Sequence, residues 1–245
     1  RLQPTGRSAT TNDLGQFRVY GLPPGEYYVS ATLRNMSTMM IDMMAGGGGA
    51  VAAPGAAQQQ TSGYAATYYP STPNPGEAQR AARIRLVVLD VDGVLTDGRL
   101  DYGAQGEAIK GFDVRYGHGI KMLRQRGIEV AILSARDSPI VAQRARELGI
   151  LRVLQGRGDK AAALKELLTE TGIAADEAAF VGDDLPDLPV LQRVGFAATV
   201  DDARAEIKAV AHWVAPQPGG RAAVRAIAEF ILRAQGVDTT ILVHG

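Results

Sequence analysis

Short apolar runs alternate with longer amphipathic segments over residues 81–235. The apolar runs are rich in Val, Ile and Leu, as buried β-strands are, and the segments between them carry apolar residues at helical spacing. The pattern predicts a first strand from Ile84 to Asp90 and further strands at residues 128–133, 152–155, 178–181, 196–200 and 212–214. It predicts helices at residues 119–126, 139–148, 160–171, 185–194 and 221–235. Strands that alternate with helices are joined by right-handed crossovers, so the expected fold is α/β, with three layers and a mainly parallel sheet.

One segment, residues 98–112, interrupts this alternation and has the pattern of a β-hairpin, with glycines at Gly103 and Gly106. It follows the first predicted strand directly. We therefore expect a hairpin beyond the carboxyl end of that strand, where it would flank a site.

The N-terminal third has a different composition. Residues 10–33 predict two β-strands joined by a turn at residues 21–25. Their pattern resembles the end of a carboxypeptidase-regulatory-like β-sandwich repeat, on the evidence of Asp13, Gly15, Phe17, Leu22, Pro23, Gly25 and Tyr27. Gly, Ala, Pro and Gln dominate the next stretch, which has too little apolar surface to fold by itself. We interpret residues 1–44 as a truncated β fragment, 45–80 as a disordered linker, 81–235 as the α/β domain and 236–245 as a tail.

Composition excludes several classes of partner and chemistry. The 26 basic and 26 acidic residues give a formal net charge of zero, so no global field attracts nucleic acid or an anionic membrane. The chain has no cysteine, which excludes disulfides and thiolate catalysis and fits a reducing compartment. No apolar run approaches the length needed to span a membrane.

Polar side chains stand where the predicted strands end, or open the helix that follows. The set consists of Asp90, Asp92, Ser134, Lys160, Asp183 and Asp184. Because the carboxyl ends of parallel strands meet at one edge of a sheet, we expect these side chains to lie close together. Asp90 and Asp92 would point to the same face of their strand, and two such charges beside an apolar sheet need a cation. The alternative for this pair is a solvated Asp-Gly turn.

The order, types and spacing of this set resemble the four motifs of the haloacid-dehalogenase-type phosphatases, across residues 84–235. The resemblance implies a Rossmann-like, HAD-like domain that works with Mg²⁺ through an aspartyl-phosphate. It makes Asp90 the nucleophile, Asp92 the general acid and base, and Ser134 and Lys160 the ligands of the phosphoryl oxygens. The metal ligands would be the carboxylates of Asp90 and Asp183 and the backbone carbonyl of Asp92, and Asp184 would hold a metal-bound water.

Within this superfamily the chain resembles the capless branch that contains the 3-deoxy-D-manno-octulosonate 8-phosphate phosphatases. The supporting stretches are residues 89–98, 106–115, 127–136, 180–190 and 218–225. That branch has a hairpin flap in place of a cap domain and forms tetramers in which neighbouring subunits cover the site. The resemblance implies a cytoplasmic enzyme of lipopolysaccharide-sugar synthesis that acts on a sugar-acid phosphate, with Lys110, Arg115 and Arg136 as contacts to its carboxylate or phosphate.

Two departures from the branch concern the substrate. Ser134-Ala135-Arg136 replaces the usual Thr-Gly-Arg and keeps the hydroxyl and the guanidinium, whereas Tyr116 replaces an aspartate that we expect beside the site. The alternatives in substrate and class are a nonulosonate 9-phosphate phosphatase and a non-catalytic oligomerisation module linked to a cytidylyltransferase. The N-terminal fragment supports a further alternative, in which the chain is an extracellular carbohydrate-binding or scaffold protein. His118 could act as an acid or base, but a packed histidine is the simpler interpretation.

Overall fold

The computed structural model describes residues 30–31, 67–68 and 74–239. Within this part of the chain, a six-stranded sheet has the order β10-β9-β8-β3-β6-β7, and every neighbouring pair is parallel. The strands are β3 (Leu86–Leu89), β6 (Glu129–Leu133), β7 (Arg152–Leu154), β8 (Ala178–Val181), β9 (Phe196–Thr199) and β10 (Trp213–Val214). All four residues of β3, of β8 and of β9 are buried, as expected for strands covered on both faces. The predicted α/β fold is confirmed.

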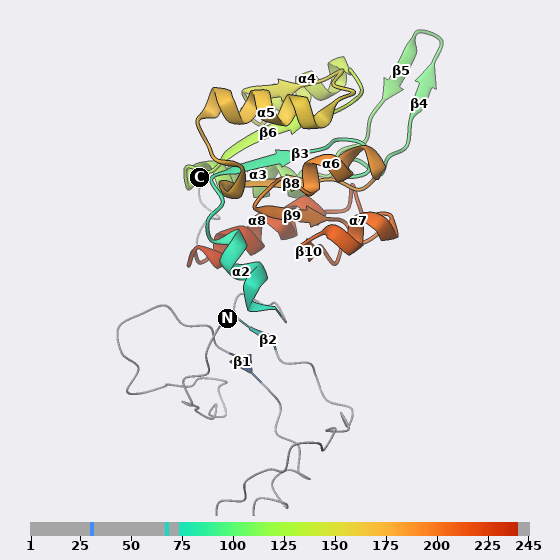
Figure 1. The fold of residues 1–245 in the computed structure, drawn as a ribbon. Coiled ribbons are helices and arrows are strands. Elements are labelled where there is room, and N and C mark those ends of the chain that lie inside the picture. Colours follow the sequence, from blue (N-terminus) through green and yellow to red (C-terminus); the bar gives the residue numbers. More distant parts are fainter. Residues whose placement is uncertain (1–29, 32–66, 69–73, 240–245) are drawn as a thin grey trace, which may run out of the picture.

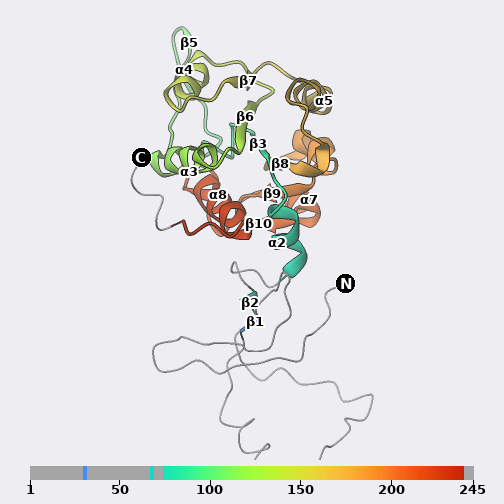
Figure 2. The ribbon, with the colours of Figure 1, turned by 90° about the vertical axis from the view of Figure 1, so that its left-hand side faces the viewer.

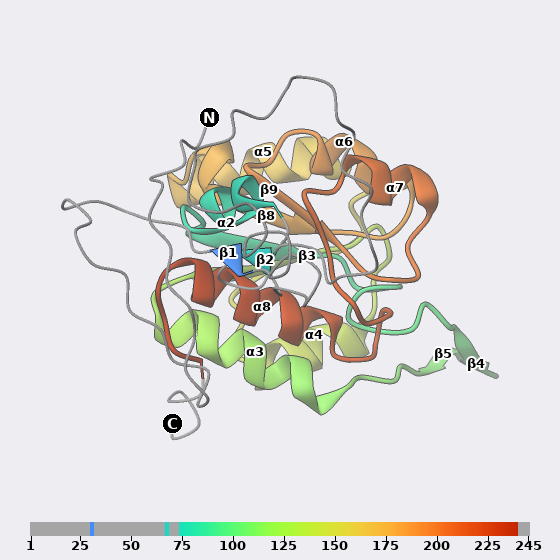
Figure 3. The same cartoon turned by 90° about the horizontal axis from the view of Figure 1, so that it is seen from below.

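Helices cover both faces of the sheet (Figures 2 and 3). One face carries α3 (Val114–Gln125), α4 (Pro139–Glu147) and α8 (Ala223–Ala234). The other carries α5 (Lys160–Thr171), α6 (Leu188–Leu191) and α7 (Ala205–Val210). Because β3 lies between β6 and β8, the three strands that end in the predicted catalytic groups are neighbours at the centre of the sheet. This arrangement is what brings those groups to one place.

The predicted hairpin is also confirmed. It consists of β4 (Asp101–Gly103) and β5 (Gly106–Ile109), which pair antiparallel and form a sheet of their own. Figure 1 shows the hairpin standing clear of the layered body, beyond the carboxyl ends of the strands. The structure places no cap domain between β3 and α3.

Helix α3 begins five residues before the predicted start at residue 119, at Val114. Asp113 caps it by accepting a hydrogen bond from the Arg115 N–H at 2.8 Å. Two glycines inside the helix obscure the sequence pattern, but each has a packing role. A Cβ on Gly117 would lie 3.0 Å from Leu148, and one on Gly119 would lie 3.1 Å from the α8 backbone. The glycines therefore let α3 approach its neighbours closely.

The predicted helix at residues 185–194 is wrong in part. The segment contains a 3₁₀ turn, η2 (Leu185–Asp187), followed by the short helix α6, which ends at Leu191. Pro186 and Pro189 each lack a backbone N–H and occupy the first turn of their element. Two prolines three residues apart thus divide the segment.

Residues 75–80, which the composition assigns to the linker, form most of α2 (Pro75–Ala81). The Asn74 side chain caps the helix by accepting from the Gly76 N–H at 2.9 Å. Ala78 and Ala81 are buried, and α2 packs against α8 and β9. This helix therefore packs on the layered body, although its sequence has the composition of the predicted linker.

Little of the N-terminal third is described. Ser30–Ala31 (β1) pairs antiparallel with Thr67–Tyr68 (β2), so a part of the predicted second strand pairs with a part of the predicted linker. The predicted first strand and its turn lie outside the described residues, as do residues 240–245 of the predicted tail. No helix in the described part of the chain is long and apolar enough to cross a membrane.

Candidate active site

The site is organised around the end of β3. The Asp90 N–H donates to the Val181 carbonyl at 3.0 Å, which continues the ladder to β8 and fixes Asp90 at the sheet edge. A tight turn follows, in which Gly93 has a φ of +87°. A Cβ at this position would lie 2.1 Å from Asp183 Oδ2, so only glycine leaves room for that carboxylate.

Lys160 lies between two carboxylates. Its Nζ is 2.9 Å from Asp90 Oδ2 and 2.6 Å from Asp187 Oδ1, and its side chain is only 3% exposed. Burial alone lowers the pKa of Lys160, but Asp90 and Asp187 raise it by more, so the net shift is upward. Lys160 is therefore a fixed cation beside the predicted nucleophile.

Asp187 also belongs to this site, although the sequence pattern gives no sign of it. Besides contacting Lys160, its carboxylate accepts hydrogen bonds from the N–H groups of Asp183, at 3.0 Å, and of Asp184, at 3.3 Å. It thereby holds the loop after β8 in shape. In the sequence it is a third aspartate three residues after the Asp183-Asp184 pair, in a segment interpreted as an ordinary helix.

Three carboxylates converge at this point. Asp90, Asp183 and Asp187 each offer an oxygen within 4.8 Å of the others. Burial and the charge of Asp187 raise the pKa of Asp90 to about 6, and burial and the charge of Asp90 raise the pKa of Asp183 to about 7. Asp183 Oδ1 is buried and has no hydrogen-bond partner. An oxygen-only donor set with an open acceptor and excess negative charge fits a hard divalent cation such as Mg²⁺.

Asp92 lies apart from this group. Its Oδ1 accepts a hydrogen bond from Lys110 Nζ, and its Oδ2 lies 3.6 Å from Arg136 Nε. The side chain of Lys110 is 1% exposed, whereas that of Arg136 is 41% exposed. The structure thus brings two predicted substrate contacts to the predicted acid and base. The predicted metal contact of the Asp92 backbone carbonyl stays a prediction.

Ser134 directly follows β6 and is buried. Its N–H donates to the Leu154 carbonyl at 2.9 Å, and its hydroxyl oxygen accepts from the Arg136 N–H at 3.2 Å. These contacts hold Ser134 across from Asp90 and Lys160 at the same edge of the sheet. The predicted catalytic groups line one cavity of about 380 Å³ together with Asp97, Arg136, Asp183, Asp184, Asp187 and Asp202.

Arg115 is not among the residues that line this cavity. It is exposed at the start of α3, where its guanidinium lies 2.6 Å from Asp113 and holds the pKa of that carboxyl below its usual range. Tyr116 does not line the cavity either. It is 2% exposed in the core, and its hydroxyl accepts from Arg144 Nε at 3.0 Å. Tyr116 therefore belongs to the core. The expectation that this departure removes a carboxylate from beside the site is wrong.

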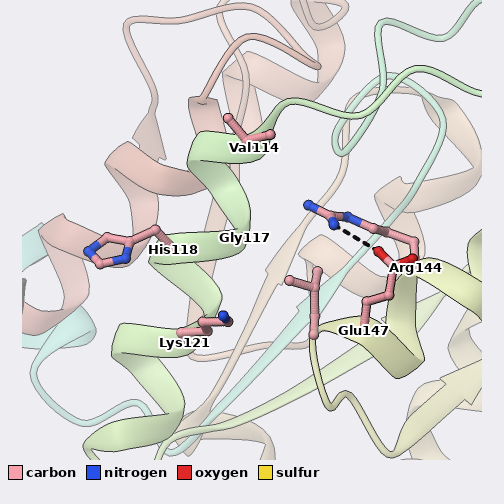
Figure 4. A pocket seen from close by; sticks show the side chains of 7 residues that line it. Val114, Gly117, His118, Lys121, Arg144 and Glu147 are labelled. Atoms are coloured by element: carbon pink, nitrogen blue, oxygen red, sulfur yellow. Dashed lines mark hydrogen bonds and ion pairs between the residues drawn. The ribbon is translucent and has the colours of Figure 1, made fainter. Parts of the chain in front are cut away.

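A second pocket, of about 300 Å³, lies between α3 and α4 and is lined by Val114, Gly117, His118, Lys121, Arg144, Glu147 and Leu148. Figure 4 shows Arg144 turned toward Glu147, with which it pairs at 3.0 Å, while His118 points to the other side of α3. None of the predicted catalytic groups lines this pocket. His118 is half-buried here and does not line the cavity at the sheet edge.

Comparison with known proteins agrees with this geometry. Residues 144–227 match the family model of the haloacid dehalogenase-like hydrolases. The chain is 45% identical over 158 residues to the 3-deoxy-D-manno-octulosonate 8-phosphate phosphatase of Haemophilus influenzae, covering 64% of this chain and 88% of that one. The enzyme of the same name from Salmonella typhimurium is 42% identical over 172 residues, covering 70% and 90%.

Solved structures give the same result. The octulosonate phosphatase of Yersinia pestis matches with a TM-score of 0.65 and 43% identity, over 66% of this chain and 87% of that one. The enzyme of Moraxella catarrhalis, solved with a magnesium ion, a phosphate ion and KDO, matches with a TM-score of 0.63 and 41% identity, over 65% and 91%.

Proposed function

Because the chain belongs to the haloacid dehalogenase-like hydrolases, in the family of the 3-deoxy-D-manno-octulosonate 8-phosphate phosphatases, we propose that it hydrolyses this sugar-acid phosphate. The observation that carries the proposal is the cavity at the sheet edge. Asp90, Lys160 and Asp183 meet there at salt-bridge and metal-binding distances, and Asp92 and Ser134 line the same cavity. The products are 3-deoxy-D-manno-octulosonate and inorganic phosphate.

The reaction takes place in two steps on the groups of this chain. In the first, an Asp90 carboxylate oxygen attacks phosphorus, the bond from phosphorus to the sugar oxygen breaks, and Asp92 donates a proton to that oxygen. In the second, Asp92 accepts a proton from a water that attacks the aspartyl-phosphate, which releases phosphate and restores Asp90. The two steps together return Asp90 and Asp92 to their starting states.

The remaining groups bind and orient the phosphoryl group. Lys160 supplies a buried positive charge beside Asp90, and the Ser134 hydroxyl donates to a phosphoryl oxygen. Bound by the carboxylates of Asp90 and Asp183, Mg²⁺ would lower the repulsion between the nucleophile and the dianionic phosphate. Asp187 does not need to bind the metal, because its oxygens already accept from Lys160 and from two backbone N–H groups.

We further propose a homotetramer that assembles through the hairpin. Leu100, Tyr102, Ile109 and Val114 are exposed on or beside it, which is unusual for apolar side chains so close together. An open cavity without a cap domain also needs a cover to keep water from weakening its electrostatic contacts. A neighbouring subunit would supply that cover. We place the reaction in the cytoplasm, within lipopolysaccharide-sugar synthesis.

A panel of sugar-acid phosphates tests the proposed substrate. We expect phosphate release to be fastest with 3-deoxy-D-manno-octulosonate 8-phosphate, slower with a nonulosonate 9-phosphate, and abolished by EDTA and restored by Mg²⁺. A higher kcat/KM for the nonulosonate would favour the alternative substrate. No release from any member, with added Mg²⁺, would favour the non-catalytic oligomerisation module.

A further inference from the structure

Four charged side chains near the mouth of the cavity form a closed ring of alternating sign. Lys110 contacts both Asp92 and Glu107, the latter at 3.1 Å, and Arg136 lies 3.6 Å from Asp92 and 3.8 Å from Glu107. The ring joins the turn after β3, the hairpin strand β5 and the loop after β6. Three separate segments of the chain are therefore tied together by charge.

Glu107 is the member of this ring to which the sequence analysis gave no role. Most of the hairpin is exposed, and Ile109 on the same strand is 64% exposed, yet the Glu107 side chain is only 11% exposed. Its Oε2 accepts a hydrogen bond from the Ser138 hydroxyl at the start of α4. The Ser138 N–H in turn donates to Gln155 Oε1 at 3.0 Å, so Glu107 is anchored to the body of the domain.

The charges explain why Glu107 matters for the two cations. A lysine that is 1% exposed needs carboxylates around its ammonium, and Glu107 is one of the two that contact Lys110. Burial alone raises the pKa of Glu107, but Ser138, Lys110 and Arg136 lower it by more, so Glu107 is ionised. The ring has no net charge as a result.

Two atoms of the ring are buried and make their contacts as ion pairs inside it: Arg136 Nε lies 3.6 Å from Asp92 Oδ2, and Glu107 Oε1 lies 3.1 Å from Lys110 Nζ. Arg136 also lines the cavity, and its Nη2 donates to the Tyr102 hydroxyl at 3.1 Å. A guanidinium that lines the cavity, is 41% exposed and is held at one end by Tyr102 can bind a carboxylate of a ligand in that cavity. The orientation of the Arg136 guanidinium depends on the charged and polar groups around it.

We propose that Glu107 is a positioning residue for substrate recognition, which holds Arg136 in the orientation that binds the carboxylate end of a sugar-acid phosphate, with buried Lys110 tying Glu107 to Asp92. This inference rests on the proposed function. Glu107 acts through the two cations, and its own contacts with Ser138 and the hairpin determine where they point.

The test compares Glu107→Gln with wild-type protein on two substrates. With 3-deoxy-D-manno-octulosonate 8-phosphate, the variant should raise KM roughly tenfold and change kcat less than about threefold, because recognition and not chemistry is weakened. With p-nitrophenyl phosphate, which has no carboxylate, kcat/KM should change less than about threefold. Calorimetry should show a matching loss of affinity for free 3-deoxy-D-manno-octulosonate.

Two further variants complete the design. Glu129→Gln, a matched control, removes a glutamate that pairs with Arg152 on β6 and β7 away from the cavity, and should leave both substrates unaffected. In a Lys110→Met background, Glu107→Gln should have a smaller effect on KM than it has alone, because part of its action passes through Lys110.

Two results would overturn the inference. One is a KM for the sugar-acid phosphate that Glu107→Gln leaves unchanged, and the other is an equal loss on both substrates, which would indicate a general structural role. Either result leaves the proposed function intact if the wild-type protein hydrolyses the sugar-acid phosphate. Failure of the proposed function is separate, since the wild-type protein would then not turn over that substrate.

Discussion

Asp187 has the most demanding set of contacts of any side chain in the site. One oxygen pairs with Lys160 and the other accepts from two backbone N–H groups, while the residue is 1% exposed. An asparagine at this position would have one acceptor oxygen instead of two. Its NH₂ group would face either the Lys160 ammonium or the two backbone N–H groups, which are themselves donors. The charge of Asp187 and its geometry are both required.

We therefore expect Asp187→Asn to lower the free energy of unfolding by about 2–4 kcal/mol, because it leaves a buried lysine or a backbone donor without its partner. Urea denaturation measures this. The matched control is Asp176→Asn, which removes an exposed pair with Arg83 and should cost less than about 1 kcal/mol. Equal midpoints for the two variants would contradict the role given to Asp187.

His212 makes the stability of the domain depend on pH. Burial and the nearby Arg80 lower its pKa from the ordinary value of 6.5, and its Nδ1 accepts from the Ala197 N–H at 2.8 Å, so the folded protein holds the neutral form. The unfolded chain binds the proton more readily. The contribution of His212 is thus complete above about pH 6.5 and decreases as the pH falls below that value.

His212→Asn removes the titration and keeps an acceptor near the Ala197 N–H. The melting temperature of this variant should fall less between pH 7.5 and pH 5.5 than that of the wild-type protein. Identical pH dependence in the two proteins would show that His212 does not contribute.

The sequence predicts a helix or strand well when many of its residues show the expected pattern of apolar and polar positions. Strands such as β3 and β8 are buried along their whole length, and α5 matches its predicted range because Asp159 caps it and Gly172 ends it. The sequence pattern predicts no helix at α7, since that helix is six residues long and buries only Ile207. Too few positions were available to show a period.

The same holds for the candidate site. The positions of Asp90, Ser134 and Asp183 could be predicted because each lies one or two residues after the end of a strand. Asp187 and Glu107 could not, because their roles come from contacts with residues distant in sequence or from a turn whose shape the sequence pattern does not reveal. Arg115 shows the opposite case, since it is close to the hairpin in sequence but pairs with Asp113 outside the cavity.

The α2 helix gives a prediction about the N-terminal segment. Deleting residues 1–73 should leave the melting temperature and the turnover nearly unchanged, because α2 and its cap remain. Deleting residues 1–81 should lower the free energy of unfolding by about 1–3 kcal/mol, since Ala78 and Ala81 no longer cover α8 and β9. Calorimetric melting of the two truncated proteins measures the difference, and similar losses in both would place the domain boundary earlier.

Assembly of the whole molecule depends, in this account, on the apolar side chains of the hairpin. Tyr102 also contacts Arg136, so Ile109, which is 64% exposed, is the cleaner position to change. We expect Ile109→Asp to convert the proposed tetramer to smaller species and to raise KM. Light scattering after size exclusion measures the mass. Leu151→Asp, at an 87% exposed position beside β7, is the matched control and should remain tetrameric.

A wild-type monomer that is fully active at nanomolar concentration would refute the proposed assembly. The chemistry at the end of β3 would be unaffected by that result.

That chemistry is the central claim, and the most direct measurement is Mg²⁺-dependent phosphate release by Asp90→Asn beside the wild-type protein. The substitution keeps the shape of the side chain and leaves Asp187 paired with Lys160, so circular dichroism should show an unchanged fold. Turnover should fall by roughly a thousandfold or more, because an amide is not a nucleophile toward phosphorus. A folded Asp90→Asn protein that releases phosphate at close to the wild-type rate would contradict the account.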